Sequence, residues 1–152
     1  MKTLVTGASG FIGSTLIDHL SRSGHEVHAL VRKTSSSKNL EGLKFNRIEG
    51  SLSDRSVLRQ AVEGVELIFH VAGLTAARTL EEYREANVAG TVRLAQAAAE
   101  ALDSGSPLKR FILVSSLTAA GPGTSLEPKC EGEESHPISF YGISKLEAEI
   151  EL

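Results

Sequence analysis

The stretch Thr6-Gly7-Ala8-Ser9-Gly10-Phe11-Ile12-Gly13 decides the fold of this chain. It joins a short apolar run, residues 2–6, to a stretch with the apolar spacing of a helix, residues 11–23. Gly7 permits a sharp turn, Gly10 lets backbone approach a phosphate, and Gly13 lets the helix pack closely. Free N–H groups at the start of such a helix attract an anion. The stretch therefore predicts a binding site for the pyrophosphate of a dinucleotide.

Short apolar runs and helical stretches alternate along the rest of the sequence. We expect strands at residues 2–6, 26–31, 46–50, 66–71 and 109–115, and helices at 11–23, 54–63, 80–102 and from 141 onward. Ser53 is the expected N-cap of the second helix, and residues 119–139 are expected to form a long loop. This order predicts an α/β protein with a doubly wound parallel sheet, a Rossmann fold whose strands helices cover on both faces.

Composition places the chain among ordinary globular proteins. Its 152 residues are 41% hydrophobic and 23% charged, with a net charge of −3, so we expect one domain over residues 1–152. The absence of a basic excess argues against a nucleic-acid partner, and no apolar run reaches the length of a membrane span. Cys130 is the only cysteine, so no disulfide forms within the chain. The five histidines lack metal-ligand spacing, and we expect a cytoplasmic protein without a metal.

A second motif, Tyr141-Gly142-Ile143-Ser144-Lys145, stands near the end of the sequence. On a helix its tyrosine and lysine share one face, with Cβ atoms about 5–6 Å apart. An ammonium group beside a phenol favours the phenolate, and the pair could exchange a proton with a carbonyl or alcohol oxygen. Ser115 and Ser116 end the fifth predicted strand, at the edge where such sheets bind ligands.

Together these segments resemble the extended short-chain dehydrogenase/reductase family, the NAD-dependent epimerase/dehydratase superfamily. The resemblance also includes, in the family's order, Gly24-His25-Glu26-Val27, His70-Val71-Ala72-Gly73, Asn87-Val88-Ala89-Gly90-Thr91 and Val114-Ser115-Ser116. It implies an active set of Ser116, Tyr141 and Lys145, in which Lys145 also holds the nicotinamide ribose. Gly121 closes the serine pattern, and Thr118 is the alternative to Ser116.

The end of the second strand predicts which dinucleotide binds. An NAD-binding chain needs an acid there for the ribose 2′-OH, but this position is Val31, followed by Arg32 and Lys33. A guanidinium can hold a 2′-phosphate through two hydrogen bonds. We therefore expect NADP, with Arg32 as the main contact and NAD as the alternative; Lys33 could instead be a solvated surface residue. These residues resemble the dihydroflavonol 4-reductase-like branch.

The resemblance implies further cofactor contacts. Ser51 replaces the aspartate that the family usually has after the third strand, and Leu52 could offer its backbone N–H. Asn87 either touches the cofactor, braces the nearby loop or bonds only to its own helix. The remaining expected contacts are the glycine stretch and the end of the fourth strand: Gly7, Ser9, Gly10, Phe11, Ile12, Gly13, Val71, Ala72, Gly73, Tyr141 and Lys145.

Three functions remain open at this point. The first is the cofactor domain of an NADP(H)-dependent oxidoreductase acting on a small carbonyl or alcohol; the others are a nucleotide-sugar epimerase or dehydratase, and a non-catalytic NADP-binding module.

The sequence stops seven residues after Lys145, which predicts truncation after the fifth strand and the start of the next helix, without a substrate-binding part. Self-association or a homodimer through the exposed edge would follow. Without a substrate-binding part the chain could be either active or inactive. The acidic loop at Glu127, Glu131, Glu133 and Glu134 is expected to be solvated or to face substrate.

Overall fold

The computed structural model describes residues 1–123 and 128–152, and the chain divides into two compact units. The first unit comprises Met1–Gly73 and Arg93–Val114, and the second comprises Leu74–Val92 and Ser115–Leu152. Glu127, part of the predicted acidic loop, lies outside the described residues.

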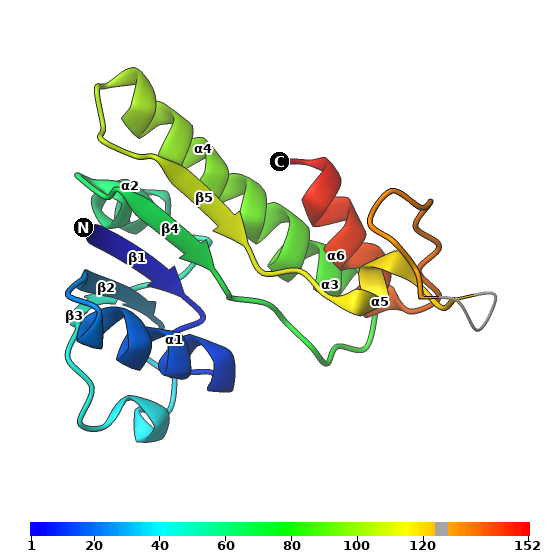
Figure 1. Cartoon of the computed structure of the whole chain (residues 1–152), viewed down its shortest axis with the longest axis horizontal. Helices are drawn as coiled ribbons and strands as arrows, with labels where there is room; N and C mark the ends of the chain where they lie inside the picture. The colour runs from blue at the N-terminus through cyan, green and yellow to red at the C-terminus, as the bar shows by residue number, and fades with distance from the viewer. Residues whose placement is uncertain (124–127) are drawn as a thin grey trace. The chain divides into compact units, whose positions relative to one another are not determined.

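The first unit is built on a five-stranded parallel sheet with the order β3-β2-β1-β4-β5 (Figure 1). The strands are β1 Lys2–Thr6, β2 Glu26–Val31, β3 Asn46–Glu49, β4 Leu67–His70 and β5 Arg110–Leu113. The order reverses between β1 and β4, which makes the carboxyl ends of these strands the place where open α/β sheets bind ligands. The predicted Rossmann-type fold is confirmed.

Helices cover both faces of this sheet because successive strand residues point to opposite faces. On one face, Leu4 and Ile68 pack with Leu58 of α2 (Arg55–Val62) and with Leu94 of α4 (Gly90–Asp103). On the other face, Val5 belongs to a second core, which also includes side chains of α1 (Phe11–Arg22) and of the 3₁₀ turn η1 (Lys38–Leu40). The glycine stretch thus lies between a buried strand and a helix that buries one face against the sheet.

The edge strand β5 departs from the expectation of full coverage. Phe111, Ile112 and Leu113 are only half-buried, and Arg110 is exposed. Only β4 pairs with β5 in the described sheet, so one side of β5 has no neighbouring strand. The apolar character of a strand does not by itself reveal whether both of its faces are packed.

The second unit is helical in the residues that the structure describes. Its elements are α3 (Leu80–Tyr83), the π-helical segment η2 (Arg84–Ala89), the start of α4, α5 (Leu117–Ala120) and α6 (Phe140–Ile150). The helix predicted over residues 80–102 is therefore continuous, but it contains π-helical turns that the apolar spacing did not indicate. The predicted loop over 119–139 was wrong at its start, because residues 119 and 120 belong to α5.

The cap of α2 corrects another expectation. Asp54, not Ser53, is its N-cap: Oδ1 of Asp54 accepts hydrogen bonds from the backbone N–H groups of Ser56 at 3.0 Å and Val57 at 3.2 Å. The hydroxyl of Ser53 instead bonds to that of Ser51 at 2.7 Å. A hydrogen bond from the Ser56 hydroxyl, with the one from the Val57 N–H, lowers the pKa of Asp54. A carboxylate is favoured here because it also interacts with the helix dipole.

We expect Asp54→Ala to lower the thermal unfolding temperature by a few degrees at neutral pH, because it leaves N–H groups of the first turn without an acceptor. Since folding lowers the pKa of Asp54, its contribution is complete above the ordinary value of 3.8 and is lost as the pH falls through the lowered value. Circular dichroism melts at neutral and acid pH measure both effects. Ser53→Ala is the control, and an equal loss in that variant would contradict the assignment of the cap.

Candidate functional site

The glycine stretch is held in place by close backbone contacts. Gly7 has a φ of +70°, and a Cβ on it would lie 2.5 Å from the backbone nitrogen of Ala72. A Cβ on Gly13 would overlap the carbonyl oxygen of Gly7. Both positions therefore require glycine for the fold itself, one for the turn after β1 and the other for the approach of α1.

The start of α1 presents unshielded backbone. Gly10 is its N-cap, and among the described residues no side chain caps this helix. Phe11 is 84% exposed and Ile12 is 55% exposed, although both are large and apolar. N–H groups in the first turn of a helix lack intrahelical acceptors and carry partial positive charge, so this end of α1 can bind an anion.

The carboxyl ends of β1 and β4 are joined through Thr6. Its Oγ1 accepts a hydrogen bond from the N–H of Ala72 at 3.2 Å and shares another with Nδ1 of His70 at 2.6 Å. Thr6 and His70 are almost fully buried. Val71 and Ala72 are half-buried and Gly73 is exposed. This end of β4 consequently lies against the turn at Gly7.

Basic side chains follow β2 at the same edge of the sheet. Val31 is buried, while Arg32 and Lys33 are exposed, and neither cation pairs with a carboxylate within the described ranges. Asn39 donates from Nδ2 to the carbonyl oxygen of Ser9 at 3.0 Å. Asn39 thus connects the loop after β2 to the glycine stretch, a contact that no sequence motif indicates.

In the segment after β3, polar side chains form hydrogen bonds with each other. Ser51 bonds through its hydroxyl to Ser53, and the half-buried Leu52 packs against the core beside α2. The Gly50 N–H donates to the carbonyl of Val31 at 3.1 Å, which keeps this segment beside the end of β2. Cofactor contacts by Ser51 and Leu52 remain predictions.

In the second unit, Ser116 is the N-cap of α5. Its Oγ accepts from the N–H of Thr118 at 3.2 Å and from the hydroxyl of Thr118 at 2.8 Å. These two hydrogen bonds occupy both acceptor positions of a hydroxyl oxygen and leave its proton to be donated elsewhere. A Cβ on Gly142 would overlap the carbonyl oxygen of Thr118, so the first turn of α6 lies directly against α5. Ser116 and Tyr141 are thereby kept on neighbouring segments.

Tyr141 and Lys145 occupy successive turns of α6. The ring of Tyr141 lies 6.1 Å from that of Tyr83, measured between centroids. Lys145 is only 3% exposed, and burial lowers the pKa of its ammonium group, although the negative charge of Glu149 opposes this effect. The hydroxyl of Ser115 donates to the carboxylate of Glu149. The two adjacent serines therefore have different partners: Ser115 bonds to Glu149 of α6, and Ser116 bonds to Thr118 of α5.

Asn87 braces the second unit. Its Oδ1 accepts from the Leu74 N–H at 2.6 Å, and its Nδ2 donates to the Leu74 carbonyl at 3.0 Å and to Oγ of Ser144 at 2.9 Å. Ser144 in turn donates to the carbonyl of Tyr141 at 2.8 Å. Asn87 is 1% exposed and Ser144 is fully buried. Of the three predicted roles for Asn87, the contacts favour bracing of the loop that follows Gly73.

Nearly the whole chain matches one known protein family. The model of the NAD dependent epimerase/dehydratase family matches residues 3–152. The chain belongs to this family. The chain therefore contains an NAD(P)-binding domain of the Rossmann type.

Known members differ in the reaction that they catalyse. A 4-hydroxy-2-methyl-3-oxo-4-farnesyl-3,4-dihydroquinoline-1-oxide ketoreductase of Stigmatella aurantiaca is 34% identical over 98% of this chain. A UDP-glucose 4-epimerase of Vibrio cholerae is also 34% identical over 98% of the chain. A short-chain dehydrogenase/reductase superfamily protein from Agrobacterium tumefaciens, solved with bound NAD, matches 99% of the chain with 27% identity and a TM-score of 0.83. The chain spans 44%, 45% and 44% of these proteins, respectively.

In the described residues, no group of three or more His, Cys, Asp and Glu side chains is arranged to hold a metal ion. No helix in residues 1–123 and 128–152 combines the length and the apolar character needed to cross a membrane.

Alanine substitutions at the three glycines distinguish an effect on folding from an effect on cofactor binding. We expect Gly10→Ala to leave the unfolding temperature within a few degrees of the parent chain, because its Cβ would meet only the Gly7 carbonyl oxygen, at 3.3 Å. The same Cβ would obstruct a phosphate at the start of α1 and weaken NADPH binding about tenfold or more. Gly7→Ala and Gly13→Ala should instead destabilise the fold. Calorimetric titration and thermal melts of the three variants test this, and unchanged NADPH affinity in Gly10→Ala would contradict the assignment.

Proposed function

We propose that this chain is the cofactor domain of an NADP(H)-dependent reductase that converts a ketone to an alcohol by hydride transfer. The observation that carries the proposal is the hydrogen bonding of Ser116. Its hydroxyl oxygen accepts two hydrogen bonds from Thr118, so its proton is available to another acceptor. A ketone oxygen is such an acceptor. Tyr141 and Lys145 are in the same unit, on the helix that packs against α5.

Arg32 supports the choice of NADP over NAD. It is exposed, follows the buried Val31, and pairs with no carboxylate within the described ranges. A carboxylate at the end of β2 would repel a ribose 2′-phosphate, whereas a guanidinium and an ammonium attract it. NAD remains the alternative, because the relative from Agrobacterium tumefaciens was solved with NAD.

Each polar group has a defined part in the proposed reaction. When bound, NADPH would supply the hydride for the carbonyl carbon. Tyr141 gives its phenolic proton to the carbonyl oxygen, and Ser116 donates a hydrogen bond to that oxygen. Lys145 would hold the nicotinamide ribose hydroxyls and would stabilise the phenolate that remains on Tyr141. Addition of one hydride and one proton to the ketone gives the alcohol and leaves the cofactor oxidised.

A nucleotide-sugar epimerase is the second candidate, favoured by the 34% identity to the UDP-glucose 4-epimerase of Vibrio cholerae. Such an enzyme regenerates its cofactor in each cycle, whereas a reductase consumes NADPH. Net cofactor oxidation in the presence of a ketone therefore distinguishes the two functions. The equal identity to the ketoreductase of Stigmatella aurantiaca means that sequence similarity alone does not decide between them.

We expect Tyr141→Phe to lower the rate of ketone-dependent NADPH oxidation at least about 100-fold, because it removes the proton donor. Tyr83→Phe is the matched control, since its ring neighbours that of Tyr141 but its hydroxyl bonds to the Thr75 carbonyl at 3.2 Å. Absorbance at 340 nm measures both rates, with NADH as a second reductant. Equal loss in the two variants, or a preference for NADH, would contradict the proposed roles.

A further inference from the structure

Large apolar side chains are exposed immediately beside the proposed reactive groups. Leu117 is 91% exposed and follows Ser116 in the chain; Phe140 is 52% exposed and precedes Tyr141; Ile138 is 83% exposed and lies two residues before Phe140. Exposed groups of large apolar side chains commonly mark binding surfaces. Their place next to Ser116 and Tyr141 is therefore informative about what binds there.

Backbone contacts hold the three segments that carry these side chains together. The His136 N–H donates to the Ala120 carbonyl at 3.0 Å. Gly121, with a φ of +78°, has no room for a Cβ because the His136 carbonyl oxygen occupies that position. A Cβ on Gly142 would meet the Thr118 carbonyl and, at 3.1 Å, Cβ of Pro137. The start of α5, residues 136–139 and the start of α6 therefore form one packed group.

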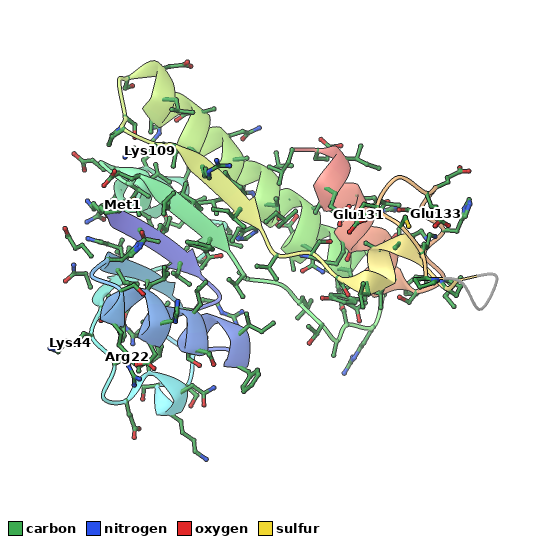
Figure 2. The ribbon with its side chains drawn as sticks, in the orientation of Figure 1. Met1, Arg22, Lys44, Lys109, Glu131 and Glu133 are labelled. Carbon is green, nitrogen blue, oxygen red and sulfur yellow. The ribbon has the colours of Figure 1, made fainter. Side chains whose placement is uncertain are left out.

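The charges next to this group are negative. Glu131, Glu133 and Glu134 are exposed on the chain that leads to α6, and Figure 2 labels the first two. The ammonium group of Lys129 already donates to the Ala120 carbonyl at 2.6 Å, and His136 lies 3.6 Å from the Glu134 carboxylate. Such a surface repels the phosphates of a nucleoside diphosphate, whereas an uncharged molecule meets no electrostatic repulsion there.

We propose that Leu117, Ile138 and Phe140 bind the apolar part of a neutral, hydrophobic ketone whose carbonyl oxygen is held by Ser116 and Tyr141. This inference rests on the proposed reductase function and names its substrate class. These three side chains then act through burial of apolar surface, which strengthens with each methylene group of the substrate that they cover.

The test uses the full chain with a series of 2-alkanones, from 2-butanone to 2-decanone. Burial of one methylene group corresponds to about a fourfold gain in affinity, so affinity should rise in steps along the series until the surface is covered. Saturation-transfer NMR measures binding of each ketone, and absorbance at 340 nm measures kcat/KM with NADPH. The NMR readout does not depend on turnover.

Polar substitutions identify the surface. Leu117→Ser and Phe140→Ser should flatten the dependence on alkyl length, with the largest loss for 2-decanone. Ile150→Ser is the matched control, since Ile150 is 73% exposed on α6 but lies near the opposite end of that helix, and it should retain the dependence. Circular dichroism checks that each variant remains folded.

The outcomes separate this inference from the proposed function. Affinity that does not depend on alkyl length, or a dependence that survives in Leu117→Ser and Phe140→Ser, would overturn the inference, as would tighter binding of UDP-glucose that these variants abolish. Dependence on length that these two variants remove supports it. If that dependence is found by NMR but no ketone oxidises NADPH, the apolar site stands and the proposed reductase activity fails.

Discussion

The close approach of two backbones, at Gly7 and at Ala72, is the constraint on which the cofactor side of this protein depends. The carboxyl ends of β1 and β4 meet there, and a positive φ at Gly7 turns the chain away from β1 within one residue. The buried Thr6 hydroxyl joins the same strand ends. With this turn fixed, α1 begins at Phe11 with its first N–H groups uncapped by any described side chain, which is the property that an anion site needs.

A comparable constraint operates in the second unit. The side chain of Asn87 is buried and bonds to both backbone groups of Leu74 and to Ser144, which lies between Tyr141 and Lys145 on α6. Buried amides that satisfy their hydrogen-bonding groups in this way specify one arrangement, because any other would leave them unpaired. Lys145 is buried on the same helix, and the loss of hydration disfavours its charged form and lowers its pKa. A pKa shifted by burial is common at functional sites.

The parts of the fold that could be predicted depend on local pattern. The order of strands and helices, the glycine turn and the Tyr141–Lys145 spacing are all visible in short windows of sequence, and the structure contains each of them. Features that depend on the three-dimensional path of the chain could not be predicted. Ser53 and Asp54 are both good caps by residue type, and only the geometry of the turn selects Asp54.

Distant neighbours also decided the details of the site. Nothing in the sequence linked Asn39 to Ser9, or Ser115 to Glu149, because each pair is joined by the path of the chain rather than by a motif. The π-helical turns that contain Asn87 escape a search for ordinary helical spacing. The family resemblance left three possible roles for Asn87, and only its hydrogen bonds favour one of them.

The central claim is that the first unit binds a dinucleotide through the start of α1, with Arg32 selecting the 2′-phosphate. Backbone and arginine side-chain ¹H–¹⁵N spectra of the chain, recorded during titration with NADPH and separately with NADH, test it most directly. We expect both cofactors to shift the amide signals of Phe11, Ile12 and Gly13, and NADPH alone to shift the Nε–H signal of Arg32. Shifts that bypass the start of α1, or identical effects of the two cofactors on Arg32, would contradict the claim.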